Sequence, residues 1–239
     1  MLWHDAAVEA AIESMSGDRL ASALGRPRRV AVFVATILAI VAVALLPLLT
    51  PLFIHPVLEA AGSASRLGMP ADVARRMSDL SVAELVLGPG TFAFAGPTGI
   101  PFYDVAERGH LADARLLLWL CLGAGIVSAL IVGLSLARAG ADTRRQAWRI
   151  ISRAGATSAG VVIALGAVSV VAFDTLFELF HRAFFPGGNY SFDPATQHLV
   201  QLYPFAFWQL ASLALAILVV LLGLGTWLLG RVMASQRLG

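Results

Sequence analysis

Four long runs of apolar residues, separated by polar stretches, give the sequence its pattern. An α-helix rises about 1.5 Å per residue, so about 20 apolar residues cross the hydrocarbon core of a bilayer. Each of the four runs reaches that length. The pattern therefore predicts four transmembrane helices, at residues 30–54, 116–137, 154–180 and 205–229.

The first apolar run is longer than the apolar core of a signal peptide, which has about 7 to 15 residues. An uncleaved membrane anchor is therefore favoured, with cleavage near residues 60–64 as the alternative. Pro47 and Pro51 should bend or end this helix near its outer end. Residues 1–29 are polar, and they predict either a short amphipathic helix on the membrane surface or a frayed terminus.

The polar stretches form the segments outside the membrane. In the longest of them, Ser81 and Glu84 have the spacing of a capping box, which predicts a short helix over residues 82–87. Glycine and proline are frequent in residues 88–101 and predict a loop. The expected fold is an all-α integral membrane protein with four transmembrane helices and an extracytoplasmic segment between the first and second. The segments outside the membrane are residues 1–29, 55–115, 138–153, 181–204 and 230–239.

The composition agrees with a membrane protein. Hydrophobic residues make up 58% of the chain and charged residues 13%, with a mean hydropathy of +0.79, whereas a soluble domain has about 25% charged residues. The pI of about 9.2 does not indicate nucleic-acid binding, because the arginines gather where membrane topology requires them. Cys121 is the single cysteine, so one chain has neither a disulfide nor a cysteine-based metal site.

The basic residues predict the orientation, because cytoplasmic segments carry an excess of Lys and Arg. With a cytoplasmic N-terminus, eleven of the 17 basic residues, all arginines, lie inside and six outside, while five acidic residues lie inside and ten outside. The inner side then carries +6 and the outer side −4, in agreement with the net charge of +2. We therefore expect both ends of the chain in the cytoplasm, and residues 55–115 and 181–204 outside.

Two histidines border the spans on the outer side. His110 lies 28 residues before Arg138, and His181 lies 28 residues after Arg153. If the helices are straight, each histidine is about 42 Å from that arginine, roughly the thickness of a bilayer with its headgroups. The second and third spans are antiparallel with a short connection, so they should be neighbours. We therefore expect the two histidines to meet in the outer headgroup layer.

Carboxylates accompany both histidines. Glu107, His110 and Asp113 are spaced by three residues and share one face of a helix. Asp174 and His181 are seven residues apart and also share a face. A carboxylate beside an imidazole favours its charged form and fixes its tautomer. Ionisable groups at membrane depth are functional candidates, so these clusters predict a working site.

Other interpretations of the clusters stay open. A metal-dependent hydrolase would use four ligands, Glu107, His110, Asp174 and His181. A scaffold without activity would use the histidines as headgroup contacts. Arg115 either supports the cluster or only marks the end of its helix. A transporter is disfavoured because no span carries an ionisable group at mid-membrane.

Two motifs carry a resemblance to a known family. In residues 107–115 an acidic residue, a histidine, an aspartate and an arginine follow the pattern ERGHLADAR. A longer aromatic motif begins FDTLFELFHRAFF at Phe173 and ends at Trp208. With the order of the spans, these motifs resemble four-span bacterial membrane proteins, the family containing the lipoprotein intramolecular transacylases (Lit). Departures from the family pattern are Tyr190, His198 and the poorly matching residues 55–101.

The resemblance implies an acyltransferase that moves the sn-2 acyl chain of a diacylglyceryl-cysteine lipoprotein to the α-amino group of the same cysteine. It implies that the histidines are catalytic, that lipoproteins and membrane lipid are the partners, and that no metal, cofactor or nucleic acid is involved. The implied location is the bacterial cytoplasmic membrane, with the site on the outer face. The residues implied are catalytic His110 and His181, supporting Glu107, Asp113, Asp174 and Arg115, and acyl-chain-binding Phe180, Phe184, Tyr190 and Trp208.

Overall fold

The computed structural model describes residues 25–236, so most of the polar N-terminal segment, residues 1–29, lies outside the described residues. Within this range the chain forms helices, and its one β-bridge, between Ala95 and Pro101, is isolated. The elements in order are α2 (Arg26–Leu45), the 3₁₀ helix η1 (Leu46–Leu49), α3 (Pro51–Ala60), α4 (Ser63–Leu67), α5 (Ala71–Val86), α6 (Val105–Ala137), α7 (Ala141–Phe184), α8 (His198–Leu202) and α9 (Phe205–Ser235).

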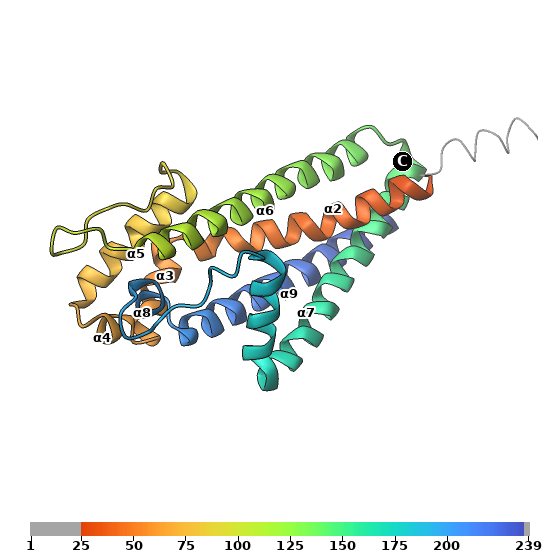
Figure 1. Cartoon of the computed structure of the whole chain (residues 1–239). Coiled ribbons are helices and arrows are strands. Elements are labelled where there is room, and N and C mark those ends of the chain that lie inside the picture. The colour runs from red at the N-terminus through yellow and green to blue at the C-terminus, as the bar shows by residue number, and fades with distance from the viewer. Residues whose placement is uncertain (1–24, 237–239) are drawn as a thin grey trace, which may run out of the picture.

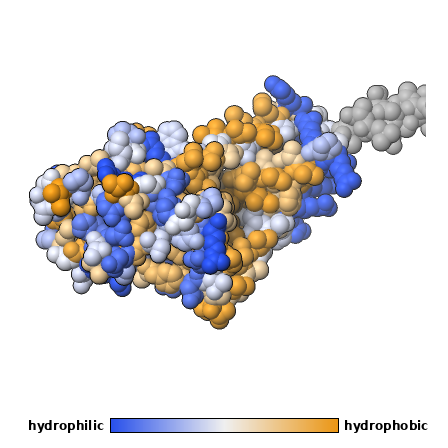
Figure 2. Space-filling view, viewed as in Figure 1, coloured by the Kyte–Doolittle hydropathy of each residue, from blue (hydrophilic) through white to orange (hydrophobic). Residues whose placement is uncertain are grey.

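Within residues 25–236, four helices are long and apolar enough to cross a membrane: α2 with η1, α6, α7 and α9. They form an elongated bundle, in which the start of α2 and the end of α9 lie at the same end (Figure 1). At the other end α3, α4, α5, α8 and the loop of residues 87–104 form a cap. Apolar side chains cover most of the bundle, whereas polar ones are frequent on the cap (Figure 2). The protein is therefore an all-α, multi-pass membrane protein, as the sequence predicts.

Small residues let the membrane helices approach closely. A Cβ added to Gly155 of α7 would lie 2.5 Å from the carbonyl oxygen of Gly223 in α9, and one added to Gly125 of α6 would overlap Ala42 of α2. Helices in lipid associate through such packing, because apolar side chains gain little by leaving apolar lipid. As a result α7 pairs with α9 and α6 with α2, while α6 and α7 touch at few points. The expectation of neighbouring second and third spans is therefore wrong along most of their length.

The third membrane helix, α7, bends sharply. At Ala172 the backbone leaves helical geometry, with φ −141° and ψ 33°, and residues 173–184 fold back towards the rest of the bundle (Figure 1). Residues 167–176 contain neither proline nor glycine, so the local sequence does not mark the bend. The depth estimate for His181, which assumed a straight helix, is therefore wrong. His181 still lies beside the cap, because the folded-back part leads directly into the loop before α8.

Helix α5 begins after Pro70, well before the predicted start near residue 82. Ser81 does not cap it: its hydroxyl donates to the Met77 carbonyl and lies 2.8 Å from the hydroxyl of Tyr103. The predicted capping box at Ser81 and Glu84 is therefore wrong. The reason is that Ser81 lies on the buried face of an amphipathic helix whose apolar and hydroxyl residues pack against the loop.

The loop of residues 88–101 and the residues after it fill the core of the cap. Phe92, Phe102 and Tyr103 are almost completely buried, together with Leu202 of α8. A further hydrogen bond of 2.9 Å joins the hydroxyls of Ser78 and Tyr203. Aromatic packing and buried hydroxyl pairs thus hold α8 and the loop of residues 87–104 against α5.

Candidate active site

His110 and His181 stack against each other between α6 and the folded-back part of α7. The ring centroids are 6.0 Å apart and the planes 19° from parallel. His181 is 8% exposed, and His110 is half-buried. Because Asp104 caps α6, His110 lies in its second turn, and the bend at Ala172 brings His181 back to it. The structure thus brings together the two histidines that the sequence singles out.

Aromatic rings surround the pair. The ring of Phe185 lies 4.6 Å from His110 and 5.4 Å from His181, and so covers both. Phe192 lies 5.4 Å from His110, and Phe177 lies 4.2 Å from His181. The imidazole faces therefore contact aromatic rings, and the ring nitrogens, at the edges, are the atoms that can take part in polar chemistry.

Of the four aromatic residues expected to bind acyl chains, two contact the histidine pair and two lie one ring further out. Phe180 and Tyr190 contact His181 directly, with centroid distances of 5.3 and 5.1 Å. Phe184 lies 5.0 Å from Phe180, and Trp208 lies 6.4 Å from the ring of Phe177. Phe180, Phe184 and Trp208 are exposed on the outside of the bundle. They connect the histidine pair to the surface that faces lipid.

The ring nitrogens differ in their hydrogen bonds. His181 Nδ1 lies 2.8 Å from the carbonyl oxygen of Phe177. Since a carbonyl only accepts, Nδ1 carries the proton and the neutral ring has its lone pair on Nε2. His110 Nδ1 is buried and without a partner in the part of the chain described. A buried donor without an acceptor is rarer than the reverse, so the proton of His110 belongs on Nε2.

Asp113 lies one turn after His110 in α6, and its partner was not predicted. The side-chain amide of Asn189 donates from Nδ2 to Asp113 Oδ2 at 2.7 Å. Asn189 belongs to the turn after α7, where Gly188 has a φ of +71°. The sequence marks this turn by its Pro-Gly-Gly stretch, but contains no signal that pairs Asn189 with a residue 76 positions earlier.

Glu107 faces away from the histidines. Its carboxylate accepts from the backbone amides of Asp104 at 2.7 Å and Leu199 at 2.6 Å. The Asp104 carboxylate in turn accepts from the Glu107 amide at 2.8 Å, and this capping box begins α6. Glu107 is 2% exposed and joins α6 to α8. The expectation that it lies beside the imidazoles is therefore wrong, because the capping geometry turns it into the cap.

Arg115 and Asp174 also contact neither histidine. Arg115 Nη1 donates to the carbonyl of Glu84 near the end of α5 at 2.9 Å, and its guanidinium lies 5.1 Å from the centre of the Trp119 ring. Asp174 is exposed just after the bend and forms no hydrogen bond or ion pair within residues 25–236. Arg115 holds two helices together, and Asp174 has no contact that supports a catalytic part.

Two further histidines have partners that the sequence does not suggest. His198 stacks on Phe102 with centroids 4.6 Å apart, and its Nδ1 bonds to the carbonyl of Phe102. These contacts leave His198 half-buried. His55 Nε2 pairs with Asp79 at 2.8 Å across α3 and α5. Both histidines stabilise the cap, away from the stacked pair.

The geometry gives a metal-dependent hydrolase no support. In residues 25–236 no three His, Cys, Asp or Glu side chains form a group that could hold a metal ion. Both carboxylate oxygens of Glu107 accept from backbone amides, which removes one of the four ligands considered.

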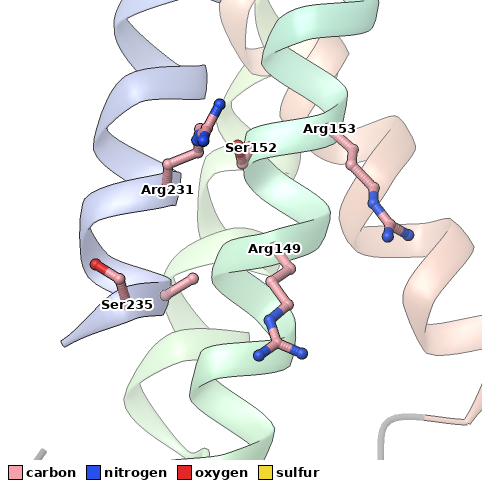
Figure 3. A pocket seen from close by; sticks show the side chains of 7 residues that line it. Arg149, Ser152, Arg153, Arg231 and Ser235 are labelled. Atoms are coloured by element: carbon pink, nitrogen blue, oxygen red, sulfur yellow. The ribbon is translucent and has the colours of Figure 1, made fainter. Parts of the chain in front are cut away.

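A cavity of about 340 Å³ lies at the opposite end of the bundle, between α7 and α9 (Figure 3). It contains neither a general acid nor a general base: the hydroxyl of Ser152 donates to the carbonyl of Trp227 at 2.9 Å. In Figure 3 the guanidinium groups point in different directions and do not meet at one anion. The histidine pair is therefore the stronger candidate for an active site. The cavity is lined by Arg149, Ser152, Arg153, Gly230, Arg231, Ala234 and Ser235.

Comparisons with known proteins indicate a family and a fold for the chain. The family model described as "Lipoprotein intramolecular transacylase Lit" matches residues 82–208. Curated proteins gave no match. Among solved structures, the membrane integral lipoprotein intramolecular transacylase Lit from Bacillus cereus has a TM-score of 0.71 at 18% identity, covering 87% of this chain and 94% of that chain.

Two variants of the same Bacillus cereus protein match similarly. The variant with a histidine replaced by arginine has a TM-score of 0.66 at 17% identity, covering 95% of this chain and 96% of that chain. The variant with alanine instead has 0.65 at 19%, covering 87% and 92%. At these identities the structures establish a shared fold, while the family match extends over more than half of the chain.

Proposed function

Because the chain belongs to the lipoprotein intramolecular transacylase (Lit) family, we propose that it moves the sn-2 acyl chain of a diacylglyceryl-cysteine lipoprotein to the cysteine's own α-amino group. The product is a lyso-form lipoprotein with an N-acyl cysteine. The observation that carries this proposal is the stacked pair of His110 and His181, 6.0 Å apart within an aromatic enclosure.

The two rings suit complementary parts in acyl transfer. An α-amino group has a pKa of about 7.7 to 8, so the free Nε2 of His181 removes its proton near neutral pH. The nitrogen then attacks the sn-2 ester carbonyl, whose oxygen accepts a hydrogen bond from Nε2–H of His110 as negative charge develops. The ester bond to glycerol breaks, and the glyceryl oxygen receives the proton from His181. Donor and acceptor belong to one substrate, so positioning supplies much of the rate.

The supporting residues act in different ways in this proposal. Asp113, one turn after His110, accepts from Asn189 and places a negative charge beside the site. Glu107 and Arg115 act through the scaffold, by holding α6 to α8 and to α5. Asp174 has no contact within the described chain on which such a part would rest.

The exposed aromatic rings supply a path for the acyl chains. Phe180, Phe184 and Trp208 are open to the lipid side and connect through ring contacts to His181. In this proposal they bind the two acyl chains of the lipoprotein, while Tyr190 closes the site on the cap side. The partners are diacylglyceryl-modified lipoproteins in the bacterial cytoplasmic membrane, and the site opens on the extracytoplasmic face.

Mass spectrometry of lipoprotein N-termini tests the proposal in a bacterial host that lacks the activity. The parent protein is expected to convert diacylglyceryl lipoproteins to the lyso form. Replacing both histidines by alanine should lower conversion by about 100- to 10,000-fold, the usual contribution of acid–base groups. The matched control is His55→Ala, which removes a histidine of the cap from its pair with Asp79.

The alternatives predict other outcomes. A non-catalytic scaffold predicts that the parent leaves the diacylglyceryl form unchanged, as does the double variant. If the folded, membrane-inserted parent produces no lyso form, the proposed transfer is wrong. If the double-histidine variant is as active as the parent, the transfer stands but its assignment to the histidines does not.

A further inference from the structure

Asn189 presents a buried hydrogen-bond acceptor that has no donor. Its Nδ2 donates to Asp113 Oδ2 at 2.7 Å, while its Oδ1 is buried and unpaired within residues 25–236. A carboxylate only accepts, so the amide must turn its NH₂ group towards Asp113 and its oxygen away. Buried polar atoms nearly always have a partner, so an unpaired oxygen beside a candidate active site requires a physical reason.

The turn that carries Asn189 packs against both imidazoles. Gly188 closes the turn with a hydrogen bond of 3.0 Å to the carbonyl of Phe185. Phe185, before the turn, lies 4.6 Å from His110, and Tyr190, after it, lies 5.1 Å from His181. Asn189 is therefore held between two residues that contact the pair. Its partner Asp113 is one helical turn beyond His110.

Two other acceptors beside the pair are already occupied. Glu178 accepts from Arg182 at 2.8 Å and from the Tyr190 hydroxyl at 3.4 Å. The Phe177 carbonyl accepts from His181. Besides the lone pairs of His110 Nδ1 and His181 Nε2, an incoming donor group near the histidines therefore has the Asn189 oxygen and the Asp113 carboxylate available to it.

We propose that Asn189 and Asp113 form the subsite for the substrate's α-amino group, with Asn189 Oδ1 accepting one of its N–H bonds. This inference rests on the proposed function. Near neutral pH most of the α-amine is a cation with three donors, and it needs acceptors and a negative charge when it leaves bulk water. The amide–carboxylate pair supplies both. It holds the nitrogen in place while one proton passes to His181.

The bonds balance in this step. A bond forms between the amine nitrogen and the sn-2 carbonyl carbon, and the bond between that carbon and the glyceryl oxygen breaks. The bound ammonium group first loses one proton to the solvent, and a second proton passes by way of His181 to the glyceryl oxygen. The N–H held by Asn189 remains on nitrogen and becomes the N–H of the amide product, so Asn189 contacts the reacting atom from start to end.

Two synthetic cysteine peptides carrying dialkylglyceryl ethers test amine binding without transfer, because an ether has no acyl group to move. One peptide has the α-amino group and the other has hydrogen in its place. The full-length protein in detergent is expected to bind the amine-bearing peptide about 10- to 100-fold more tightly, the value of a hydrogen bond to a charged group. Asn189→Leu should bind the two peptides alike.

A swapped variant separates the oxygen from the fold. Asp113→Asn combined with Asn189→Asp keeps the hydrogen bond between the two side chains and returns a free oxygen to position 189. It should recover amine preference to within about 10-fold of the parent. Gln201→Leu is the matched control for losing an amide, because Gln201 donates to the Pro194 carbonyl in the loop before α8. It should keep the full amine preference.

The outcomes distinguish the two proposals. Asn189→Leu that folds and still prefers the amine as strongly as the parent overturns the subsite. The subsite is also overturned if the swapped variant binds the two peptides as equally as Asn189→Leu does. Asn189 would then act only by positioning Asp113. Transfer itself is followed on the corresponding diacyl ester peptide. A parent that prefers the amine but transfers no acyl chain refutes the proposed function and leaves the subsite standing.

Discussion

The guanidinium of Arg115 packs against the backbone of Gly90. Gly90 has a left-handed φ of +75°, and a Cβ there would overlap the Arg115 guanidinium. Gly90→Ala is therefore expected to lower the free energy of unfolding by about 1–3 kcal/mol, through backbone strain and a displaced arginine. Gly99→Ala is the matched control, because Gly99 has a φ of +82° but open space around it. Thermal unfolding in detergent measures both, and equal shifts would show that Arg115 moves aside freely.

Asp104, the cap of α6, gives a prediction with a definite sign in pH. Burial acts to raise its pKa, but hydrogen bonds from Glu107, Gln197 and Ala106 and the charge of Arg108 outweigh it, so the pKa lies below the ordinary 3.8. A lowered pKa in the folded state stabilises the fold above the unfolded value. That contribution is lost as the pH falls through the folded value.

We therefore compare the parent with Asp104→Asn, which keeps an oxygen that accepts from the first backbone amides of α6 but never ionises. The parent should be the more stable of the two at a constant margin between about pH 5 and 8. The margin should shrink below about pH 4, as the carboxylate of the parent takes up a proton. Unfolding monitored by circular dichroism across this range measures it. A margin that grows towards acid pH would contradict the assignment.

At the scale of single residues, spacing predicts some functions and misassigns others. The spacing of three places Glu107, His110 and Asp113 on one side of α6, yet each step of three residues turns the helix face by about 60°. That turn is enough to send Glu107 into the cap while His110 meets His181. The pair of Asn189 and Asp113 depends on how a loop returns to a helix. Such long-range contacts are not encoded in local spacing.

The bend in α7 is the element-scale feature with the clearest measurement. With Cys121 replaced by serine, spin labels at residues 153 and 182 would be about 43 Å apart along a straight helix of that length. The bend at Ala172 predicts a markedly shorter distance by double electron–electron resonance. Labels at residues 108 and 137, equally separated in the unbroken α6, are the matched control and should give about 43 Å. Equal distances for the two pairs would rule out the bend.

The helices that are predictable from the sequence are those that the bilayer requires. A bilayer requires long apolar helices, so the four membrane helices are predictable from hydropathy alone. The cap has no such constraint. Helix α5 is amphipathic, and its serine hydroxyls pack against the hydroxyls of Tyr103 and Tyr203. Burial raises the pKa of Tyr203 to about 12. After the bend in α7, the aromatic segment packs against α6 and α9, and no proline marks the position of the bend.

At the scale of the whole molecule, charge and shape point to one orientation. Both ends of the described chain lie opposite the cap (Figure 1), and the positive charge of the sequence gathers at that end. We therefore predict a cytoplasmic location for those ends and an extracytoplasmic cap, as the excess of arginine favours. This is also the side from which a lipoprotein N-terminus would reach the histidine pair.

A membrane-impermeant thiol reagent tests the orientation in intact cells. In a Cys121→Ser background, Thr98→Cys places a thiol on the exposed loop of the cap, and Asp142→Cys places one at the exposed start of α7. The first should react in intact cells and the second only after lysis. The reverse pattern would place the histidine pair on the cytoplasmic side, away from lipoproteins that have crossed the membrane. The orientation therefore bears directly on the function, since an inward-facing site could not act on such substrates.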